Sequence, residues 1–383
     1  MSHFTMPSHV FSGNCAFDES LPYIVASVKK PLIVTGKHVV KSPVMEKIIA
    51  GLKEKNINPV VFDGITGEPT DQMITEGVKA YKIGGCDSLI GVGGGSPLDS
   101  AKAIAAMTVL DGSIADYNGK VLNGNFPEII AIPTTAGTGS EVTQYSVITS
   151  VKDGIKMLLK GAVLPDIAVV DPSFTYGCPP SVTAATGMDA FTHAVEAYTS
   201  IHAFPLSDVY ALDAAKRIYR YLPGAYSNGN DEKAREEMSL AALEAGFTIN
   251  NSTVTIVHGM SRPIGALFHV PHGISNAMLI CECLSFAAKG APKRFADLGR
   301  ALGGADDKTS DIEAAEAFIR CTRKLCNEVG IPTLREYGIN QEKFEEAIDK
   351  MAHDAIASGS PGNTIREVTE EDVKELYRKV IRA

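Results

Sequence analysis

The feature that most constrains the fold is an alternation of short apolar runs with amphipathic segments in the first half of the chain. Five runs carry it: PLIVT at 31–35, NPVVF at 58–62, DSLIGVGG at 87–94, EIIAIP at 128–133 and IAVVD at 167–171. This alternation is typical of βαβ units. Because the runs are almost entirely apolar, we expect strands that are buried on both faces of a parallel sheet.

Helix signals lie between these runs. Ser42-Pro43 and Thr70-Asp71 are expected to begin two of the intervening helices, and Gly84-Gly85 is expected to end one. The pattern changes after Pro179-Pro180, where the sequence becomes rich in Ala, Leu and Glu and has few β-branched runs outside 253–257. This composition predicts amphipathic helices.

The predicted fold class is therefore an α/β domain with a parallel sheet followed by an all-α domain. We place the first domain at residues 1–180 and the second at 181–383. A length of 383 residues exceeds one typical core and fits two domains of ordinary size.

Composition and charge exclude several classes of partner. The net charge of −9 makes nucleic acid an unexpected partner, and no stretch of 18 apolar residues indicates a membrane span. The N-terminal sequence MSHFTMPSHVFSG has no basic region followed by an apolar core, so we expect a cytoplasmic protein. The seven cysteines include no CxxC pair, as expected for reduced thiols.

One carboxylate and three imidazoles occur at spacings that suit a divalent metal. Asp189 and His193 are four residues apart in TGMDAFTHAVEAY, which lacks proline and predicts a helix with both side chains on one face. His258 and His272 lie in VHGM and VPHG, fourteen residues apart. These donors suit Fe2+, Zn2+, Mn2+ or Co2+, and the absence of cysteine argues against a thiolate-rich structural site. A single buried histidine is more often a core residue, but three histidines and one aspartate together favour a metal site.

A glycine-rich loop follows the third apolar run. Gly94 and Gly95 allow close approach of a bound group, and we expect Ser96 to cap a helix, with Asp99 completing a capping box. Backbone N–H groups at a helix start suit a pyrophosphate, although a tight turn is an equally good interpretation. The loop is not a GxGxxG motif.

A second loop of small residues, PTTAGTGSE at 133–141, follows the fourth run. Its candidates for contacting the ribose and amide of a nicotinamide are Thr134, Thr135, Thr138 and Ser140. A simple turn is the commoner role of such a string.

Taken together, GGGSPLDSAK at 93–102, PTTAGTGSEVT at 133–143, the segment 169–198 and the VHGM and PHG motifs resemble the iron-containing, or group III, alcohol dehydrogenase family. The resemblance covers nearly the whole chain. It implies a dinucleotide-binding α/β domain joined to a helical metal-binding domain, a plan shared with dehydroquinate synthase.

The resemblance also assigns roles. Asp189, His193, His258 and His272 correspond to the metal ligands. Gly94, Gly95 and Ser96 correspond to the pyrophosphate loop, and Thr135 and Thr138 to positions on the nicotinamide side. It further implies Fe2+, NAD or NADP, and a homodimer or larger homo-oligomer.

Two positions depart from the family pattern. Gly36-Lys37 stands where many members carry an aspartate for the adenosine ribose, which leaves NAD or NADP open. Arg262 stands where many members carry a further active-site histidine. His269 is a candidate substitute proton relay, with an ordinary structural role as the alternative.

The function that we predict is reversible hydride transfer between a small primary alcohol or its aldehyde and NAD(P). The alcohol has an anionic end if Arg262 binds substrate. If Arg262 instead pairs with a protein carboxylate, such as Glu196 or Asp99, its role is structural. The alternatives are an NAD- and metal-dependent lyase of the dehydroquinate synthase kind and a metal-binding protein without catalysis.

Overall fold

The structure is a computed structural model that describes residues 2–152 and 154–382. The chain divides into two compact units. One comprises Thr5–Cys178, and the other comprises Pro179–Ala383 with the N-terminal residues up to Phe4.

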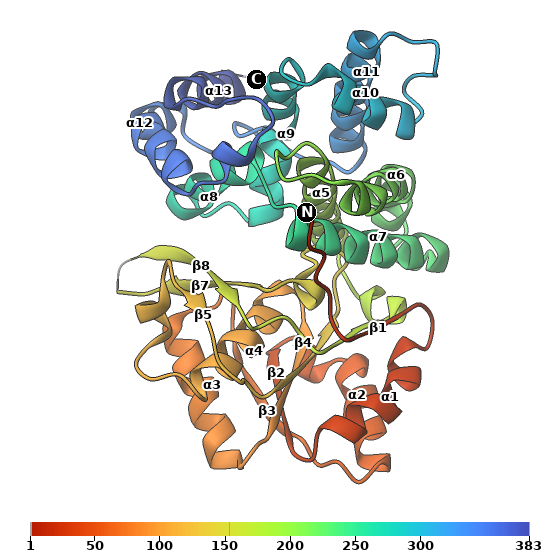
Figure 1. Cartoon of the computed structure of the whole chain (residues 1–383), viewed down its shortest axis with the longest axis vertical. Helices are drawn as coiled ribbons and strands as arrows, with labels where there is room; N and C mark the ends of the chain where they lie inside the picture. Colours follow the sequence, from red (N-terminus) through yellow and green to blue (C-terminus); the bar gives the residue numbers. More distant parts are fainter. Residues whose placement is uncertain (1, 153, 383) are drawn as a thin grey trace. The chain divides into compact units, whose positions relative to one another are not determined.

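A six-stranded parallel sheet organises the first unit, with strand order β1-β9-β6-β4-β2-β3 (Figure 1). Its strands are β1 (His9–Ser12), β2 (Pro31–Gly36), β3 (Val60–Ile65), β4 (Ser88–Gly93), β6 (Glu128–Pro133) and β9 (Ile167–Val170). All five apolar runs thus form strands of a parallel sheet, as predicted. The edge strand β1, short and incompletely buried, was not expected.

Helices cover both faces of this sheet (Figure 1). Alternate residues of β2 enter different clusters: Ile33 packs with α1 (Ala16–Ser27) and α2 (Pro43–Glu54), whereas Leu32 packs with α3 (Asp71–Gly84) and α4 (Gly95–Met107). Burial on both faces explains why β2, β4, β6 and β9 are continuously apolar. The expectation of two buried faces was wrong for β3, an edge strand in which Val61 is exposed.

The expected helix signals are confirmed in α2 and α3. The Ser42 and Thr70 hydroxyls accept hydrogen bonds from the amides of Met45 and Met73. Gly85 ends α3 with a φ of 59°, a left-handed conformation that glycine adopts without a steric penalty.

The prediction for the start of α4 was wrong. Gly94, not Ser96, is the N-cap, and Ser96 lies inside the first turn. The capping box with Asp99 does not form, because the Asp99 carboxylate accepts hydrogen bonds from Ser140 and Val147 instead.

A second sheet of three strands, ordered β5-β8-β7, was also not predicted. It consists of β5 (Val121–Leu122), β7 (Tyr145–Ser150) and β8 (Ile155–Gly161). Gly161 has a φ of 145°, and a Cβ there would lie 2.1 Å from the Leu122 carbonyl oxygen. Only glycine fits this approach of β5 to β8.

The second unit is helical, and no strand occurs among its described residues. Its helices are α5 (Pro180–Tyr198), α6 (Pro205–Ser227), α7 (Glu232–Asn251), α8 (Ile256–Phe268), α9 (His272–Ala288), α10 (Pro292–Ala301), α11 (Asp311–Glu328), α12 (Gln341–Ala357) and α13 (Glu370–Arg382). The β-branched run 253–257 spans the end of the break between α7 and α8, with a φ of 115° at Thr253, and the first two residues of α8. Within the described residues, no helix has the length and apolarity that a bilayer crossing requires.

Candidate metal centre and cofactor loops

Three helices of the second unit bring the four predicted metal ligands together. Asp189 and His193 project from α5, His258 from α8, and His272 is the first residue of α9. Asp189 Oδ1 lies 3.9, 3.6 and 3.7 Å from Nε2 of His193, His258 and His272, respectively. The ligand atoms of Asp189, His258 and His272 all lie within 4.8 Å of one another, and this mutually close group does not include His193.

A glycine allows α9 to begin against α5. A Cβ on Gly273 would lie 2.1 Å from the Ala185 carbonyl oxygen, so any larger residue would push the start of α9 away. His272 therefore reaches Asp189 because glycine follows it. The histidine rings pack on one another, with centroids 4.8 Å apart for His193 and His258 and 5.2 Å apart for His258 and His272.

Glu196 lies behind His258 and is fully buried. Its Oε2 is hydrogen-bonded to Nδ1 of His258, while its Oε1 accepts from the Thr255 hydroxyl at 2.7 Å and the Val257 amide at 2.6 Å. A carboxylate that accepts the Nδ1 proton fixes the tautomer in which Nε2 keeps its lone pair toward the metal position. Sequence reasoning considered Glu196 only as a partner for Arg262. Its spacing of seven residues from Asp189, two helical turns, was the available signal.

Asn276 is a second residue that sequence reasoning missed. Its Nδ2 lies 2.7 Å from Asp189 Oδ1, 3.2 Å from His258 Nε2 and 3.3 Å from His272 Nε2. The signal was its position four residues after His272 on the same helix.

Electrostatics favour the protonation states that metal ligands need at Asp189 and His272, whereas at His258 burial lowers the pKa but Glu196 and Asp189 raise it overall. Burial alone would raise the pKa of Asp189, but the surrounding imidazoles lower it well below its usual range. Burial lowers the pKa of His272 to about 3, which keeps its imidazole neutral near pH 7.

The donor set fits a divalent ion. Ligands about 2.1 Å from a tetrahedral ion lie about 3.4 Å apart, close to the 3.6–3.9 Å separations from Asp189 Oδ1. An oxygen anion with neutral imidazoles suits Fe2+, Zn2+, Mn2+ or Co2+.

Arg262 and His269 occupy different surroundings. The Arg262 guanidinium is partly buried and donates to the Ser360 hydroxyl at 3.0 Å. It forms no ion pair with any described residue, so neither carboxylate considered from the sequence neutralises it. Burial lowers the pKa of Arg262, and the charge of Glu196 opposes that shift. His269 is exposed and ends α8 in a left-handed conformation with a φ of 55°.

The two predicted cofactor loops lie against each other within the first unit. The Thr134 amide donates to the Gly93 carbonyl at 2.8 Å. A Cβ on Gly95 would lie 2.8 Å from Thr138 Cγ2, and one on Gly94 would lie 3.5 Å from the Thr135 side chain. The loops thus meet at the start of α4, and the first backbone N–H groups of a helix generally suit an anion.

A buried polar network connects α4 to the second loop and to β7. The Ser140 hydroxyl donates to Asp99 at 2.6 Å, and Lys102 Nζ donates to Ser140 Oγ at 2.8 Å and the Tyr145 carbonyl at 2.8 Å. Burial lowers the pKa of Lys102 to about 8 and raises the pKa of neighbouring Glu141 to about 7. The structure thus places Asp99 and Ser140 in contact with each other.

Gly36 and Lys37 lie at the end of β2. A Cβ on Gly36 would lie 3.0 Å from the Ile65 carbonyl oxygen, and Lys37 is exposed.

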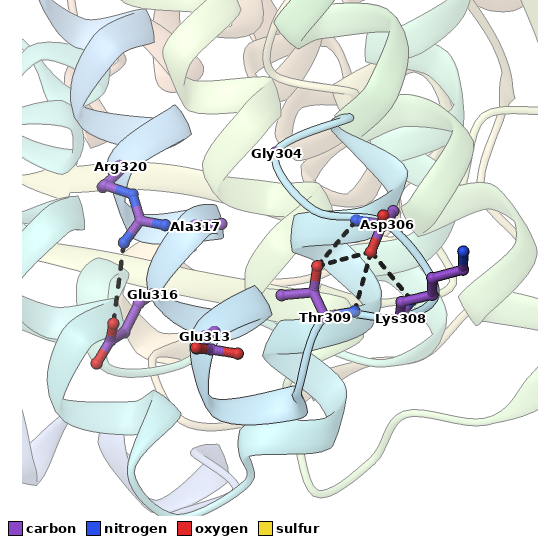
Figure 2. A pocket seen from close by; sticks show the side chains of 8 residues that line it. All are labelled: Gly304, Asp306, Lys308, Thr309, Glu313, Glu316, Ala317 and Arg320. Atoms are coloured by element: carbon purple, nitrogen blue, oxygen red, sulfur yellow. Dashed lines mark hydrogen bonds and ion pairs between the residues drawn. The ribbon is translucent and has the colours of Figure 1, made fainter.

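A separate surface pocket of about 600 Å³ lies at the α10–α11 connection (Figure 2). It contains none of the predicted site residues, and Asp306 hydrogen-bonds to Thr309 within it.

Comparisons with known proteins agree with this architecture. Residues 7–172 match the family described as iron-containing alcohol dehydrogenase, and residues 183–381 match the C-terminal part of the Fe-containing alcohol dehydrogenase family. The 1,3-propanediol dehydrogenase of Citrobacter freundii is 37% identical over 356 residues, which are 92% of this chain and 91% of the relative.

Solved structures of alcohol dehydrogenases and related reductases have the same fold. A 1,3-propanediol oxidoreductase superposes with a TM-score of 0.95 at 34% identity, covering 99% of this chain and 100% of the other. The sulfoacetaldehyde reductase of Bifidobacterium kashiwanohense, solved with NAD+, superposes with a TM-score of 0.90 at 28% identity, covering 100% and 99% of the two chains. A dinucleotide-type α/β unit and a helical unit with an Asp/His metal site define an oxidoreductase of the metal-dependent alcohol dehydrogenase class. This chain belongs to the iron-containing alcohol dehydrogenase family.

Proposed function

We propose that this enzyme transfers hydride reversibly between a small primary alcohol and a nicotinamide dinucleotide, with a divalent metal held by Asp189, His193, His258 and His272. The observation that carries the proposal is the convergence of these donors, 3.6–3.9 Å from Asp189 Oδ1. When bound, a divalent ion supplies Lewis acidity that lowers the pKa of an alcohol and makes its deprotonation accessible near neutral pH. Fe2+ is the ion that the family name implies, and Zn2+, Mn2+ and Co2+ suit the same donors.

The loops of the first unit serve the cofactor in this proposal. Backbone N–H groups of Gly94 and Gly95, with the Ser96 hydroxyl, bind the pyrophosphate at the start of α4. Thr134, Thr135 and Thr138 line the nicotinamide side. Asp99 and Ser140 hold the two loops together through their mutual hydrogen bond. The protein's main contribution to the transfer is then to position the nicotinamide and the carbinol carbon.

We propose that NADP(H) is accepted, and is used at least as well as NAD(H). Gly36 provides no carboxylate that would repel a 2′-phosphate, and Lys37 provides an exposed cation beside it. The relative solved with NAD+ supports a nicotinamide dinucleotide in general.

We propose that the alcohol or aldehyde has an anionic end, which Arg262 binds. A partly buried guanidinium without a carboxylate partner among the described residues is suited to a charge that the substrate brings. Sulfoacetaldehyde, the substrate in the name of one structural relative, combines an aldehyde with a sulfonate. His269 remains a proposed proton relay, with its exposed position at the end of α8 as the competing structural role.

We also propose how the two domains divide the function, which partners the enzyme has, and how it assembles. The first domain, residues 1–180, binds the cofactor, and the second, 181–383, binds metal and substrate. The partners are small molecules, with neither nucleic acid nor membrane, and the enzyme forms a homodimer or larger homo-oligomer in the cytoplasm.

The direct test is NAD(P)H absorbance at steady state with a panel of aldehydes after loading with Fe2+ or another divalent metal. We expect oxidation of reduced cofactor with aldehydes and reduction of NAD(P)+ with the matching alcohols. Metal binding without turnover of any aldehyde or alcohol would contradict the proposal.

A further inference from the structure

Asn276 is a neutral side chain that contacts three of the proposed metal ligands at once. It lies on α9, one turn after His272, and is fully buried. Its Nδ2 is hydrogen-bonded to Asp189 Oδ1 at 2.7 Å and lies 3.2 and 3.3 Å from Nε2 of His258 and His272. One amide nitrogen thus touches ligand atoms from α5, α8 and α9.

Asn276 is the hydrogen-bond donor in each of these contacts. An amide nitrogen only donates, and it carries two N–H groups. A carboxylate oxygen and the Nε2 atoms of two neutral imidazoles all present lone pairs, which repel one another when they converge. The N–H groups of Asn276 supply the positive ends that allow this convergence.

The tautomer of His258 is consistent with donation by Asn276. Glu196 accepts the Nδ1 hydrogen of His258, so Nε2 is left as an acceptor that faces Asn276. Each contact in the chain Glu196–His258–Asn276–Asp189 therefore has one donor and one acceptor, and Asn276 donates to both of its neighbours.

Asn276 gains little else from its position. Its Oδ1 is buried and has no hydrogen-bond partner among the described residues. A buried carbonyl oxygen without a partner destabilises the fold, so a residue placed only for packing would be better as leucine. The contacts of Nδ2 are the feature of Asn276 that a leucine cannot reproduce.

We propose that Asn276 is a positioning residue of the metal centre. Before the ion binds, its amide gathers the Asp189 carboxylate and the Nε2 atoms of His258 and His272 around one point, and an ion that binds there would replace the N–H groups as the partner of these lone pairs. The inference rests on the proposed metal binding by these residues, and it makes Asn276 a determinant of metal affinity that is not itself a ligand.

The test measures the affinity of the full-length protein for Co2+ and Zn2+ by competition with a chromophoric chelator. Asn276→Leu removes the donor at similar size, and we expect about 10–100-fold weaker binding, as for other residues that support metal ligands. The visible spectrum of bound Co2+ should keep its shape, because the ligands are unchanged. If the leucine variant does not fold, Asn276→Ser is measured with the same expectation.

Two results would overturn the inference. Affinity within about twofold of the wild type would show that the contacts of Nδ2 do not arrange the donors. A changed Co2+ spectrum would show that Asn276 is itself a ligand. Ser275→Ala is the matched control, because it removes a neighbouring, fully buried hydroxyl that hydrogen-bonds only to the His272 backbone carbonyl in the described structure.

His272→Ala separates this inference from the proposed function. If the wild type binds metal and His272→Ala does not, the metal centre stands whatever the result for Asn276. If the wild type binds neither ion, the metal centre and the role of Asn276 both fail.

Discussion

At the scale of a single residue, Arg262 is the proposed binding site for an anionic end of the substrate. Its guanidinium hydrogen-bonds to Ser360 and has no carboxylate partner among the described residues. A charge-assisted hydrogen bond contributes about 1.5–3 kcal/mol, or roughly 10–100-fold in kcat/KM. We therefore expect this enzyme to prefer an aldehyde with a carboxylate or sulfonate end over an uncharged aldehyde of equal length.

Arg262→His should remove this preference and retain activity on the uncharged aldehyde. The measurement is kcat/KM for the two aldehydes in the wild type and the variant. An unchanged ratio would assign Arg262 a structural role only.

Lys37 gives a prediction about the cofactor. Lys37→Asp should shift the ratio of kcat/KM from NADPH toward NADH by about 10-fold or more, because a carboxylate repels the 2′-phosphate and can accept hydrogen bonds from a ribose. Gly36→Asp is the less suitable variant, since its Cβ would approach the Ile65 carbonyl to 3.0 Å. No shift in Lys37→Asp would place the adenosine ribose elsewhere.

Residues were predictable from sequence where one helix sets the spacing. Asp189 and His193 share a face of α5 because four residues make about one turn. Glu196 and Asn276 lie at helical spacings from Asp189 and His272, but the atoms that they contact on other helices depend on three helices meeting, which no local spacing encodes. The surroundings of Arg262 were likewise not predictable, because its hydrogen-bond partner Ser360 lies 98 residues further along the chain.

At the scale of elements, the start of α9 depends on Gly273. Gly273→Ala should displace His272, because the added Cβ would lie 2.1 Å from the Ala185 carbonyl. We expect a loss of about 1–3 kcal/mol in the free energy of unfolding, together with weaker metal binding. Chemical denaturation and chelator competition measure the two effects. Gly67→Ala, where a Cβ meets nothing within 4 Å, is the control; equal behaviour of the two variants would contradict the account.

Glu244 makes a pH-dependent contribution to the stability of the α6–α7 pair. Burial, with Asp213 nearby, raises the pKa of Glu244 to about 8 in the folded state, compared with 4.5 for an unperturbed glutamate. The folded state thus holds a proton that the unfolded state has lost, and this contribution weakens as pH rises from about 4.5 to about 8.

Glu244→Gln should therefore be more stable than the wild type at pH 9, by about 1–3 kcal/mol, with the difference shrinking toward pH 5. Urea denaturation at the two pH values measures it. Glu236→Gln, on the more exposed side of the same helix, should show no such trend. A pH-independent difference for Glu244→Gln would refute the raised pKa.

Elements were predictable where burial is continuous. The apolar runs gave the parallel sheet, because strands covered on both faces have few polar residues. The three-stranded sheet was missed because β5 has two residues and exposed residues alternate with buried ones along β7 and β8. The start of α4 was misplaced because a glycine N-cap leaves no side-chain signal, whereas Ser96 suggested one.

At the scale of the whole molecule, the residues proposed for metal binding and those proposed for cofactor binding belong to different compact units. The proposed metal ligands all belong to the unit that begins at Pro179, and the glycine and threonine loops belong to the unit that ends at Cys178. Removing metal should therefore abolish hydride transfer while leaving the cofactor affinity largely intact.

The most direct test of the central claim is to measure metal content, turnover and NAD(P)H affinity on one preparation of His272→Ala beside the wild type. Losing one of four donors should greatly weaken metal binding, since the structure offers no spare anionic or imidazole donor among the described residues of the group. We predict a wild type with about one ion per chain and measurable turnover, and a variant with little metal, no turnover and an unchanged Kd for NAD(P)H by fluorescence. Full metal occupancy and turnover in His272→Ala would contradict the account.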